Sequence, residues 1–397
     1  MHSLHVYQAR KFHKFFHTDM WRFDLSIWMH VIARSSISIF IPIFLLDIGY
    51  SLSAVLAFYL AHVIVDIPLN FLLARLIQKI GAIKVYLIGT AAIIAFFALF
   101  AQLEMSQWYL FGSLVLLISI YDACYWVSHL YLFEKVSHKT KNISDNTGIL
   151  YTIKYFAAML GPAIGAIVLI AGSSKHLMAL SIFIFILSAI PLFRMKIDHE
   201  KPSKNEVLLS PKRFFKESFE RRNFLSMALW GFHKASEAVI WPVFIYITFL
   251  SLEAVAIVPI IISVTSMIFS YVAGKFAHRN RERIIAICAI IIAAIWILRL
   301  LGYSFNFYFA SVFLVGFFAL FLSVSLYSNI FERGSKVGML STSTYLNAVS
   351  MFGQLFIFLI LYFAVAVFKV DFLLTAIGLM VLGLANTLYS LSKPKKS

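Results

Sequence analysis

Long apolar runs alternate with short polar breaks along the whole chain. About twelve of these runs are close to the ~20 residues that an α-helix needs to cross the hydrocarbon core of a bilayer. This pattern predicts an all-α polytopic membrane protein with twelve transmembrane helices, short loops and no large extramembrane domain. The predicted spans cover residues 22–48, 52–78, 83–103, 107–133, 148–171, 176–194, 223–249, 253–276, 284–302, 307–330, 339–366 and 371–391.

The composition agrees with this pattern. Hydrophobic residues make up 61% of the 397 residues and charged residues 13%, against about 45–50% and about 25% in soluble globular proteins. The two cysteines, Cys124 and Cys288, both fall inside predicted spans, so the sequence has no disulfide framework and no cysteine spacing typical of a metal site. The histidines of the N-terminal tail match no recognised metal-binding spacing, and we expect no bound metal.

The net charge of +16 would fit a nucleic-acid-binding protein, but the placement of the basic residues favours a different interpretation. Most of the lysines and arginines fall in loops on one side of the predicted layout, together with both termini. Only Lys175 and Lys369 fall in loops on the other side. Cytoplasmic loops of membrane proteins carry this excess of basic residues. We therefore expect cytoplasmic termini, a multi-pass protein of a bacterial inner (plasma) membrane, and no nucleic-acid partner.

This orientation gives the first testable prediction. In a variant without Cys124 and Cys288, single cysteines placed at Ser203 and Ser397 are expected to react only with reagents on the cytoplasmic side. A cysteine at Ser173 is expected to react only from outside. Opposite sides for Ser203 and Ser397 would contradict the arrangement of six spans on each side of the central loop.

The chain also resembles itself at an offset of 200 residues. Arg34 then falls on Lys234, and Pro42 falls on Pro242. Internal duplications are common in transporters, and this one predicts two six-helix halves. The predicted organisation is an N-terminal cytoplasmic tail at 1–21, a six-helix bundle at 22–194, a cytoplasmic linker at 195–222, a second six-helix bundle at 223–391 and a cytoplasmic tail at 392–397.

This layout, together with two degenerate loop motifs, resembles the major facilitator superfamily of secondary transporters. In that family the loop after spans 2 and 8 carries a glycine, an Asp-Arg pair and a second glycine followed by basic residues. Here Gly81 stands in the first copy, and Gly274 and Arg279 stand in the second, while Gln78 and His278 replace the aspartate. The resemblance implies two bundles related by a pseudo-twofold axis and a gating role for these loops, and the missing aspartate leaves the gate latch in doubt.

A second resemblance lies in predicted span 5. Gly161, Pro162 and Gly165 match an element of the family's proton-coupled exporters, in which small residues and a proline serve a rocking bundle. The plainer interpretation is close helix packing, because glycine and proline are ordinarily enriched in membrane helices. The family's exporter arginine in span 4 is absent, and Asp122 lies in that span instead.

Five ionisable residues fall about halfway through predicted spans, roughly 17–23 Å from a membrane face at ~1.5 Å of rise per residue. Such charges are costly in a bilayer and are usually functional. Because burial disfavours the charged form of a carboxylate, we interpret these residues as a substrate and proton site, with structural ion pairs as the alternative. They are Arg34, Asp66, Asp122, Lys234 and Glu237.

Two of these interpretations stay open. Lys234 precedes Glu237 by three residues on the same helical face, so it could serve only to neutralise Glu237. If Arg34 is structural, its partner is expected to be Asp66 or Asp122.

Two histidines join the candidate substrate and proton site. His62 lies four residues before Asp66, with Asn70 four residues after, which makes one polar stripe on span 2. The stripe and Arg34 resemble family members that flip glycolipids, and the alternative is hydrogen bonding to span 11. His129, seven residues beyond Asp122, could relay protons or simply pack among aromatic rings.

These observations predict a secondary active transporter that moves a small solute by alternating access, as a proton-coupled antiporter working in efflux more than in uptake. We expect no cofactor beyond a proton or other ion gradient, a bilayer and a small-molecule or lipid substrate as partners, and function as a monomer. A lipid or glycolipid flippase of the same fold is the alternative. An enzyme is less favoured because the His and acidic residues are dispersed, and a channel because no glycine-rich filter segment is seen.

Overall fold

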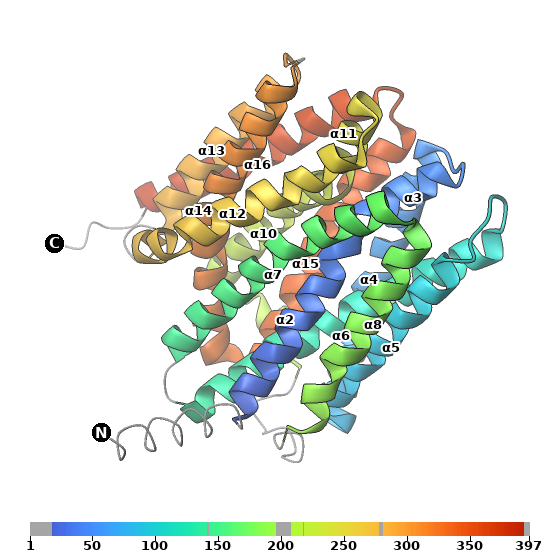
Figure 1. The fold of residues 1–397 in the computed structure, drawn as a ribbon. Helices are drawn as coiled ribbons and strands as arrows, with labels where there is room; N and C mark the ends of the chain where they lie inside the picture. Colours follow the sequence, from blue (N-terminus) through green and yellow to red (C-terminus); the bar gives the residue numbers. More distant parts are fainter. Residues whose placement is uncertain are drawn as a thin grey trace, which may run out of the picture.

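The computed structural model describes residues 18–140, 143–195, 208–216, 218–277, 281–302 and 304–392. Within these ranges the chain forms helices and loops and no strand. Figure 1 shows the blue-to-green helices of the first half beside the yellow-to-red helices of the second. The elements are α2 (Asp19–Ile37), η1 (Ser38–Phe40), α3 (Ile41–Asp47), α4 (Leu52–Ile80), α5 (Ala82–Phe100), α6 (Trp108–Thr140), α7 (Ile143–Ala171), α8 (Ser174–Phe193), α9 (Pro211–Phe214), α10 (Ser218–Ala235), η4 (Ser236–Ile240), α11 (Trp241–Phe249), α12 (Leu252–Ala277), α13 (Arg281–Arg299), α14 (Phe305–Val337), α15 (Met339–Phe363) and α16 (Val367–Ser392).

Local sequence explains where several helices begin and end. Thr18 and Ser51 cap α2 and α4, because their side-chain oxygens accept hydrogen bonds from the backbone N–H groups of Trp21 and Ala54. Gly81 separates α4 from α5 and has a φ of +92°, a conformation that strongly favours glycine. The predicted glycine of the first loop motif therefore forms the turn between two long helices.

The first span of each half breaks at an equivalent place. Predicted span 1 is divided into α2, η1 and α3, and predicted span 7 is divided into α10, η4 and α11. Pro42 lies at the start of α3 and Pro242 at the start of α11. Proline has no backbone N–H for the hydrogen bond to the preceding turn, so both spans change helical geometry just before it. In the second half the change is a π-helical turn, η4.

The two halves share one pattern of helix packing. In the first half α2 contacts α7 and α8, α6 contacts α4 and α5, and α5 contacts α8. In the second half the corresponding helices do the same: α10 contacts α15 and α16, α14 contacts α12 and α13, and α13 contacts α16. This equivalence is the predicted pseudo-twofold relation between two bundles.

The bundles meet along two equivalent pairs of helices, α4 with α15 and α7 with α12. Contacts of α11 with α3 and of η1 with α12 also join them. At the ends of α3 and α11 the Tyr246 hydroxyl donates a hydrogen bond of 2.7 Å to the Asp47 carboxylate. The end of the protein where α3 and α11 finish, here called the α3/α11 end, is therefore tied together across the bundles in this conformation.

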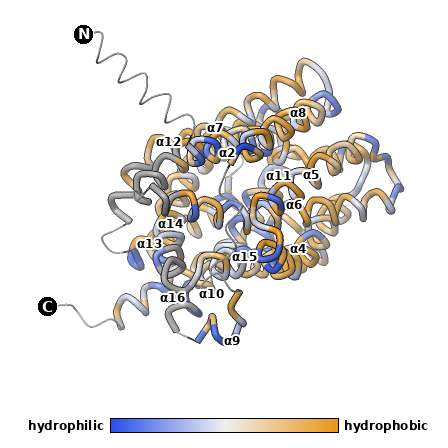
Figure 2. Tube along the Cα trace, turned by 90° about the horizontal axis from the view of Figure 1, so that it is seen from below, coloured by the Kyte–Doolittle hydropathy of each residue, from blue (hydrophilic) through white to orange (hydrophobic). Residues whose placement is uncertain are grey.

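Ten of the described helices are long and apolar enough to cross a membrane. Many of their large apolar side chains are exposed on the outside of the bundles, as a lipid environment requires, and Figure 2 shows hydrophobic residues dominating the outer helices α4, α5 and α8. The rod formed by α10, η4 and α11 and the helix α13 occupy the remaining two predicted spans. Helix α13 has charged residues at both ends, which lowers its mean hydropathy. The predicted count of twelve is consistent with this arrangement.

The predicted linker at 195–222 contains a short helix, α9, and the first residues of α10, which begins at Ser218 rather than at 223. The linker residues that the structure describes pack against α15. The Leu209 backbone N–H donates to the Ser341 hydroxyl at 3.0 Å, and the Tyr345 hydroxyl donates to the Leu209 carbonyl at 2.8 Å. The linker therefore contacts the second bundle directly at the start of α15.

Candidate functional site

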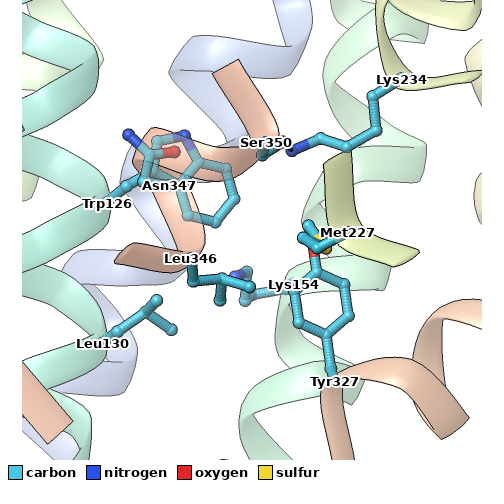
Figure 3. Close-up of a pocket in the computed structure, with 9 residues that line it drawn as sticks. All are labelled: Trp126, Leu130, Lys154, Met227, Lys234, Tyr327, Leu346, Asn347 and Ser350. Atoms are coloured by element: carbon cyan, nitrogen blue, oxygen red, sulfur yellow. Dashed lines mark hydrogen bonds between the residues drawn. The ribbon is translucent and has the colours of Figure 1, made fainter. Parts of the chain in front are cut away.

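A cavity of about 120 Å³ lies between the two bundles. It is bounded by α6 and α7 of the first bundle and by α10, α14 and α15 of the second, so both bundles contribute to its wall. Figure 3 shows the side chains that line it. They are Trp126, Leu130, Lys154, Met227, Lys234, Tyr327, Leu346, Asn347 and Ser350.

Three cations surround one aromatic ring at this cavity. The Trp126 ring centroid lies 5.5 Å from the Arg34 Cζ atom, 5.5 Å from the Lys154 Nζ atom and 5.9 Å from the Lys234 Nζ atom. Cations within about 6 Å of an indole are attracted to its face. The ring therefore holds together three positive side chains from α2, α7 and α10 that would otherwise repel one another.

The two lysines are held from different sides of the cavity. The Lys234 ammonium donates a hydrogen bond of 2.9 Å to the Ser350 hydroxyl, and the Lys154 Nζ atom lies 3.3 Å from the His129 Nε2 atom. By helical rise Lys154 lies only ~9 Å into the predicted span 148–171, yet its side chain lines the cavity.

Arg34 pairs with Asp122. The Arg34 Nη2 atom lies 3.2 Å from the Asp122 Oδ1 atom, and the side chains are 33% and 7% exposed. The guanidinium also lies 5.8 Å from the Tyr121 ring and 5.5 Å from the Tyr125 ring. Of the two partners that the sequence proposed for Arg34, the structure therefore shows Asp122.

His129 belongs to a stack of rings behind the cavity. The Tyr125 ring lies 4.8 Å from His129 and 4.5 Å from His30, nearly parallel to both. The His30 Nε2 atom lies 2.9 Å from the Tyr121 hydroxyl oxygen. The sequence interpretation did not single out His30, although it lies one helical turn before Arg34 on the same face. Both the packing role and the relay role of His129 fit this arrangement, since its ring is stacked and also touches Lys154.

The polar stripe on α4 divides between two neighbours. The His62 Nδ1 atom lies 3.0 Å from the Ser119 hydroxyl oxygen of α6, within the first bundle. Asp66 and Asn70 instead face α15 of the second bundle. The side-chain amide of Asn347 donates to the side-chain Oδ1 atom of Asn70 at 2.8 Å and to the Asp66 carboxylate at 3.4 Å. The predicted hydrogen bonding to span 11 is therefore present, and it crosses the bundle interface.

Glu237 has a partner that the sequence did not indicate. The Arg299 Nη1 atom lies 2.9 Å from the Glu237 Oε1 atom, so Glu237 pairs with Arg299 and not with Lys234. Arg299 and Asp371 both lie near the ends of predicted spans, yet both are fully buried. The available sequence signal was that each interrupts an otherwise apolar run.

The glycines of the span-5 motif permit a close approach of two helices. A side chain at Gly161 or Gly165 of α7 would overlap Ser35 and Ser36 of α2. Pro162 lies between them within α7. The corresponding close contact in the second bundle uses Gly231 and Gly353. The packing interpretation of the motif has direct support here, and a gating role stays a prediction.

The second loop motif is only partly described. Gly274 lies in the last turns of α12, and Arg279 lies outside the described residues. Just after the motif, Arg281 at the start of α13 forms an ion pair with Glu332 of α14 at 2.5 Å. This pair ties the loop to the neighbouring helix where the family's aspartate is missing.

Comparison with known protein families identifies the family of this chain. The sequence pattern of the Major Facilitator Superfamily matches residues 23–356 of the chain. The chain belongs to this superfamily. It is therefore a multi-pass membrane transporter, and the resemblance seen in the sequence is confirmed.

The fold agrees with this membership. The chain is similar to the crystal structure of the human organic anion transporter MFSD10 (TETRAN), with a TM-score of 0.61 and 12% sequence identity over 92% of this chain and 98% of that chain. At this identity the likeness shows the fold alone. No curated protein matches the sequence.

Proposed function

We propose that this transporter moves a small anionic solute by alternating access, coupled to a proton gradient and in the export direction. The observation that carries the proposal is the cavity between the bundles. Two lysine ammonium groups line it and no carboxylate is among its lining residues. The nearby carboxylate of Asp122 is paired with Arg34, and that of Asp66 accepts a hydrogen bond from the cavity residue Asn347.

An anion would be attracted from both sides of the cavity. A carboxylate or phosphate group between Lys154 and Lys234 would lie beside two ammonium groups, and hydrogen bonds between such charged groups are strong. Lys154 belongs to the first bundle and Lys234 to the second. A bound anion would therefore attract both bundles at once, which is the property needed for a solute that travels with the rocking motion.

Proton coupling and direction rest on other features. Asp66 and Asp122 are buried carboxylates in the first bundle, and Glu237 and Asp371 lie in the second. Buried carboxylates near mobile cations are suited to binding and releasing protons. The export direction rests on the resemblance of Gly161, Pro162 and Gly165 to the family's proton-coupled exporters.

The alternative of a lipid flippase has less support from the site. In the sequence this alternative rested on Arg34 together with the polar stripe on α4. In the structure neither His62 nor Asp66 lines the cavity, and both are engaged by neighbouring helices. A flippase would also require the cavity to accept a headgroup larger than the present volume of about 120 Å³.

The test uses the purified protein in liposomes that contain a pH-sensitive dye. Under an imposed pH gradient, adding benzoate is expected to drive proton movement beyond that in protein-free liposomes, which corrects for the uncharged solute that crosses the bilayer unaided. Benzylamine, of similar size and opposite charge, is expected to drive no proton movement beyond that control. Lys234→Gln is expected to lower the benzoate-driven rate at least about tenfold, equivalent to about 1.4 kcal/mol of lost anion attraction. Proton movement with benzylamine but not benzoate would contradict an anionic substrate.

The matched control is Lys175→Gln, which removes a lysine from the first turn of α8, away from the cavity. It is expected to transport at the unmodified rate. An equal loss in both lysine variants would show that net charge matters and the cavity lysine does not. Accumulation of labelled benzoate with no dependence on the pH gradient would contradict proton coupling while leaving the anion site intact.

A further inference from the structure

A second buried group of charges lies in the second bundle, outside the cavity. Arg299 of α13 is fully buried, with its guanidinium 3.6 Å from the Trp241 ring centroid and 4.3 Å from that of Trp296. Its Nε atom donates to the Ser311 hydroxyl at 3.0 Å, and its Nη1 atom donates to Glu237 at 2.9 Å. The two indole rings and the serine fix the guanidinium in one place.

Asp371 of α16 lies beside this pair without a salt bridge of its own among the described residues. Its carboxylate accepts a hydrogen bond of 2.8 Å from the Ser236 hydroxyl, which lies 2.6 Å from the Thr375 hydroxyl. Glu237 and Arg299 are near enough to act on Asp371 electrostatically. One carboxylate oxygen of Asp371 and one of Glu237 have no hydrogen-bond partner within the described part of the chain.

The charges of this group do not balance. Glu237 on η4 and Arg299 on α13 are the ionisable groups that act on Asp371 within the described residues. His233 on α10 acts on Arg299, and α15 contains no acidic or basic side chain. The His233 Nδ1 atom accepts a hydrogen bond from the Trp296 indole at 3.2 Å, so this nitrogen carries no proton and the ring is neutral. Two carboxylates and one guanidinium leave one excess negative charge in a dry environment, which one proton would remove.

The hydroxyl groups around Asp371 suit both protonation states. When Asp371 is ionised, Ser236 donates to it and can accept from Thr375. When Asp371 is protonated, it can donate to Ser236, whose hydrogen then turns to the Phe232 carbonyl 3.0 Å away. In each state the Asp371 Oδ1 atom and the Ser236 hydroxyl keep a hydrogen-bond partner, so gaining or losing the proton requires only that hydroxyl hydrogens rotate.

This group is not a remnant of the duplication. Two hundred residues earlier the sequence has Ile37 and Leu99 in place of Glu237 and Arg299, and α8, the counterpart of α16, contains no acidic residue. Ser236 and Glu237 also lie in the π-helical turn η4, a geometry frequent at functional sites. Glu237 follows the cavity residue Lys234 by about one helical turn on the same helical rod.

We propose that Glu237 and Asp371 together bind a single proton beside Arg299, and that this is where the transporter loads the proton that its cycle moves. The proposal rests on the proposed proton-coupled function. The proton is held because two carboxylates face one guanidinium. Removing either acid leaves a balanced pair and abolishes proton binding at the other acid.

Infrared spectroscopy of the purified protein in lipid bilayers, without any transported solute, tests the proposal directly, because a protonated carboxyl group has a carbonyl band distinct from those of a carboxylate. A band of this kind is expected at neutral pH and is expected to vanish in Asp371→Asn and also in Glu237→Gln. Both amides keep the shape of the acids, and if one variant does not fold the other gives the same test. Asp122→Asn and Asp66→Asn are the matched controls and are expected to leave this band in place.

Three results would overturn the proposal. One is a band that survives both Asp371→Asn and Glu237→Gln, and the second is loss of the band with Asp371→Asn alone, which would show an isolated acid without the charge balance. The third is removal of the band by sodium but not by potassium, which would show a cation site. The infrared readout is independent of transport. An intact band together with failure of the pH-gradient assay would contradict proton-coupled transport. Proton-coupled transport without the band would place the proton at Asp66 or Asp122.

Discussion

Replacing Arg34 with alanine is expected to lower transport about a hundredfold. The substitution leaves Asp122 without its partner, and breaking a buried ion pair costs about 3–5 kcal/mol. We expect the lower end of that range because the Arg34 side chain is one third exposed, and about 3 kcal/mol corresponds to about a hundredfold. Arg34→Lys is expected to remain folded and inserted but to lose most transport, because lysine supplies a point charge and cannot reproduce the planar contact with Tyr125 and Trp126.

The measurement is benzoate-driven proton movement in liposomes, with the amount of inserted protein determined in parallel. Arg22→Lys is the matched control, because Arg22 lies on the same helix at its far end and interacts with Asp19 and the Arg194 carbonyl, away from the cavity. The double variant Arg34→Asp with Asp122→Arg keeps an ion pair between α2 and α6 and reverses its direction. We expect it to regain stability without transport, and full recovery of transport would show that Arg34 serves only to hold the helices together.

Asn347→Ala is expected to shift the conformational balance of the transporter away from the state described here. The amide of Asn347 makes two hydrogen bonds across the bundle interface, to Asp66 and to Asn70. Losing such contacts from a buried site costs about 1–3 kcal/mol, which corresponds to a population shift of roughly 5- to 150-fold. These bonds hold α4 against α15, so they have to break if the bundles separate along this interface during the cycle.

Spin labels at Ile48 and Leu250, in the loops after α3 and α11, measure the separation of the bundles at the α3/α11 end. The fraction of molecules with a changed distance is expected to rise in Asn347→Ala. Ser343→Ala serves as the control, since Ser343 lies on the same helix and bonds only to its own backbone, at the Leu340 carbonyl. Identical distance distributions in the unmodified protein and Asn347→Ala would show that the network does not select the conformation.

Much of this architecture could be predicted from the sequence because membrane helices satisfy their backbone hydrogen bonds locally. Apolar length alone located most of the spans. The offset repeat of Pro42 and Pro242 marked equivalent positions in spans 1 and 7, and the structure shows that both spans break there. The depths of Arg34 and Asp122 followed from the constant rise of a helix. The resemblance to the superfamily then implied the pairing of the two bundles.

The sequence by itself determined which residues are helical, how deep each charge lies and that the two halves are copies. Only the tertiary structure decided which charges meet. In the structure Glu237 pairs with Arg299 and not with Lys234, which is closer in the sequence. Lys154 lines the cavity, and Asp371 accepts a hydrogen bond from Ser236. The physical reason is that helical rise fixes the position of a residue along the membrane normal, whereas its partner depends on how each helix is rotated and packed against helices far away in the sequence.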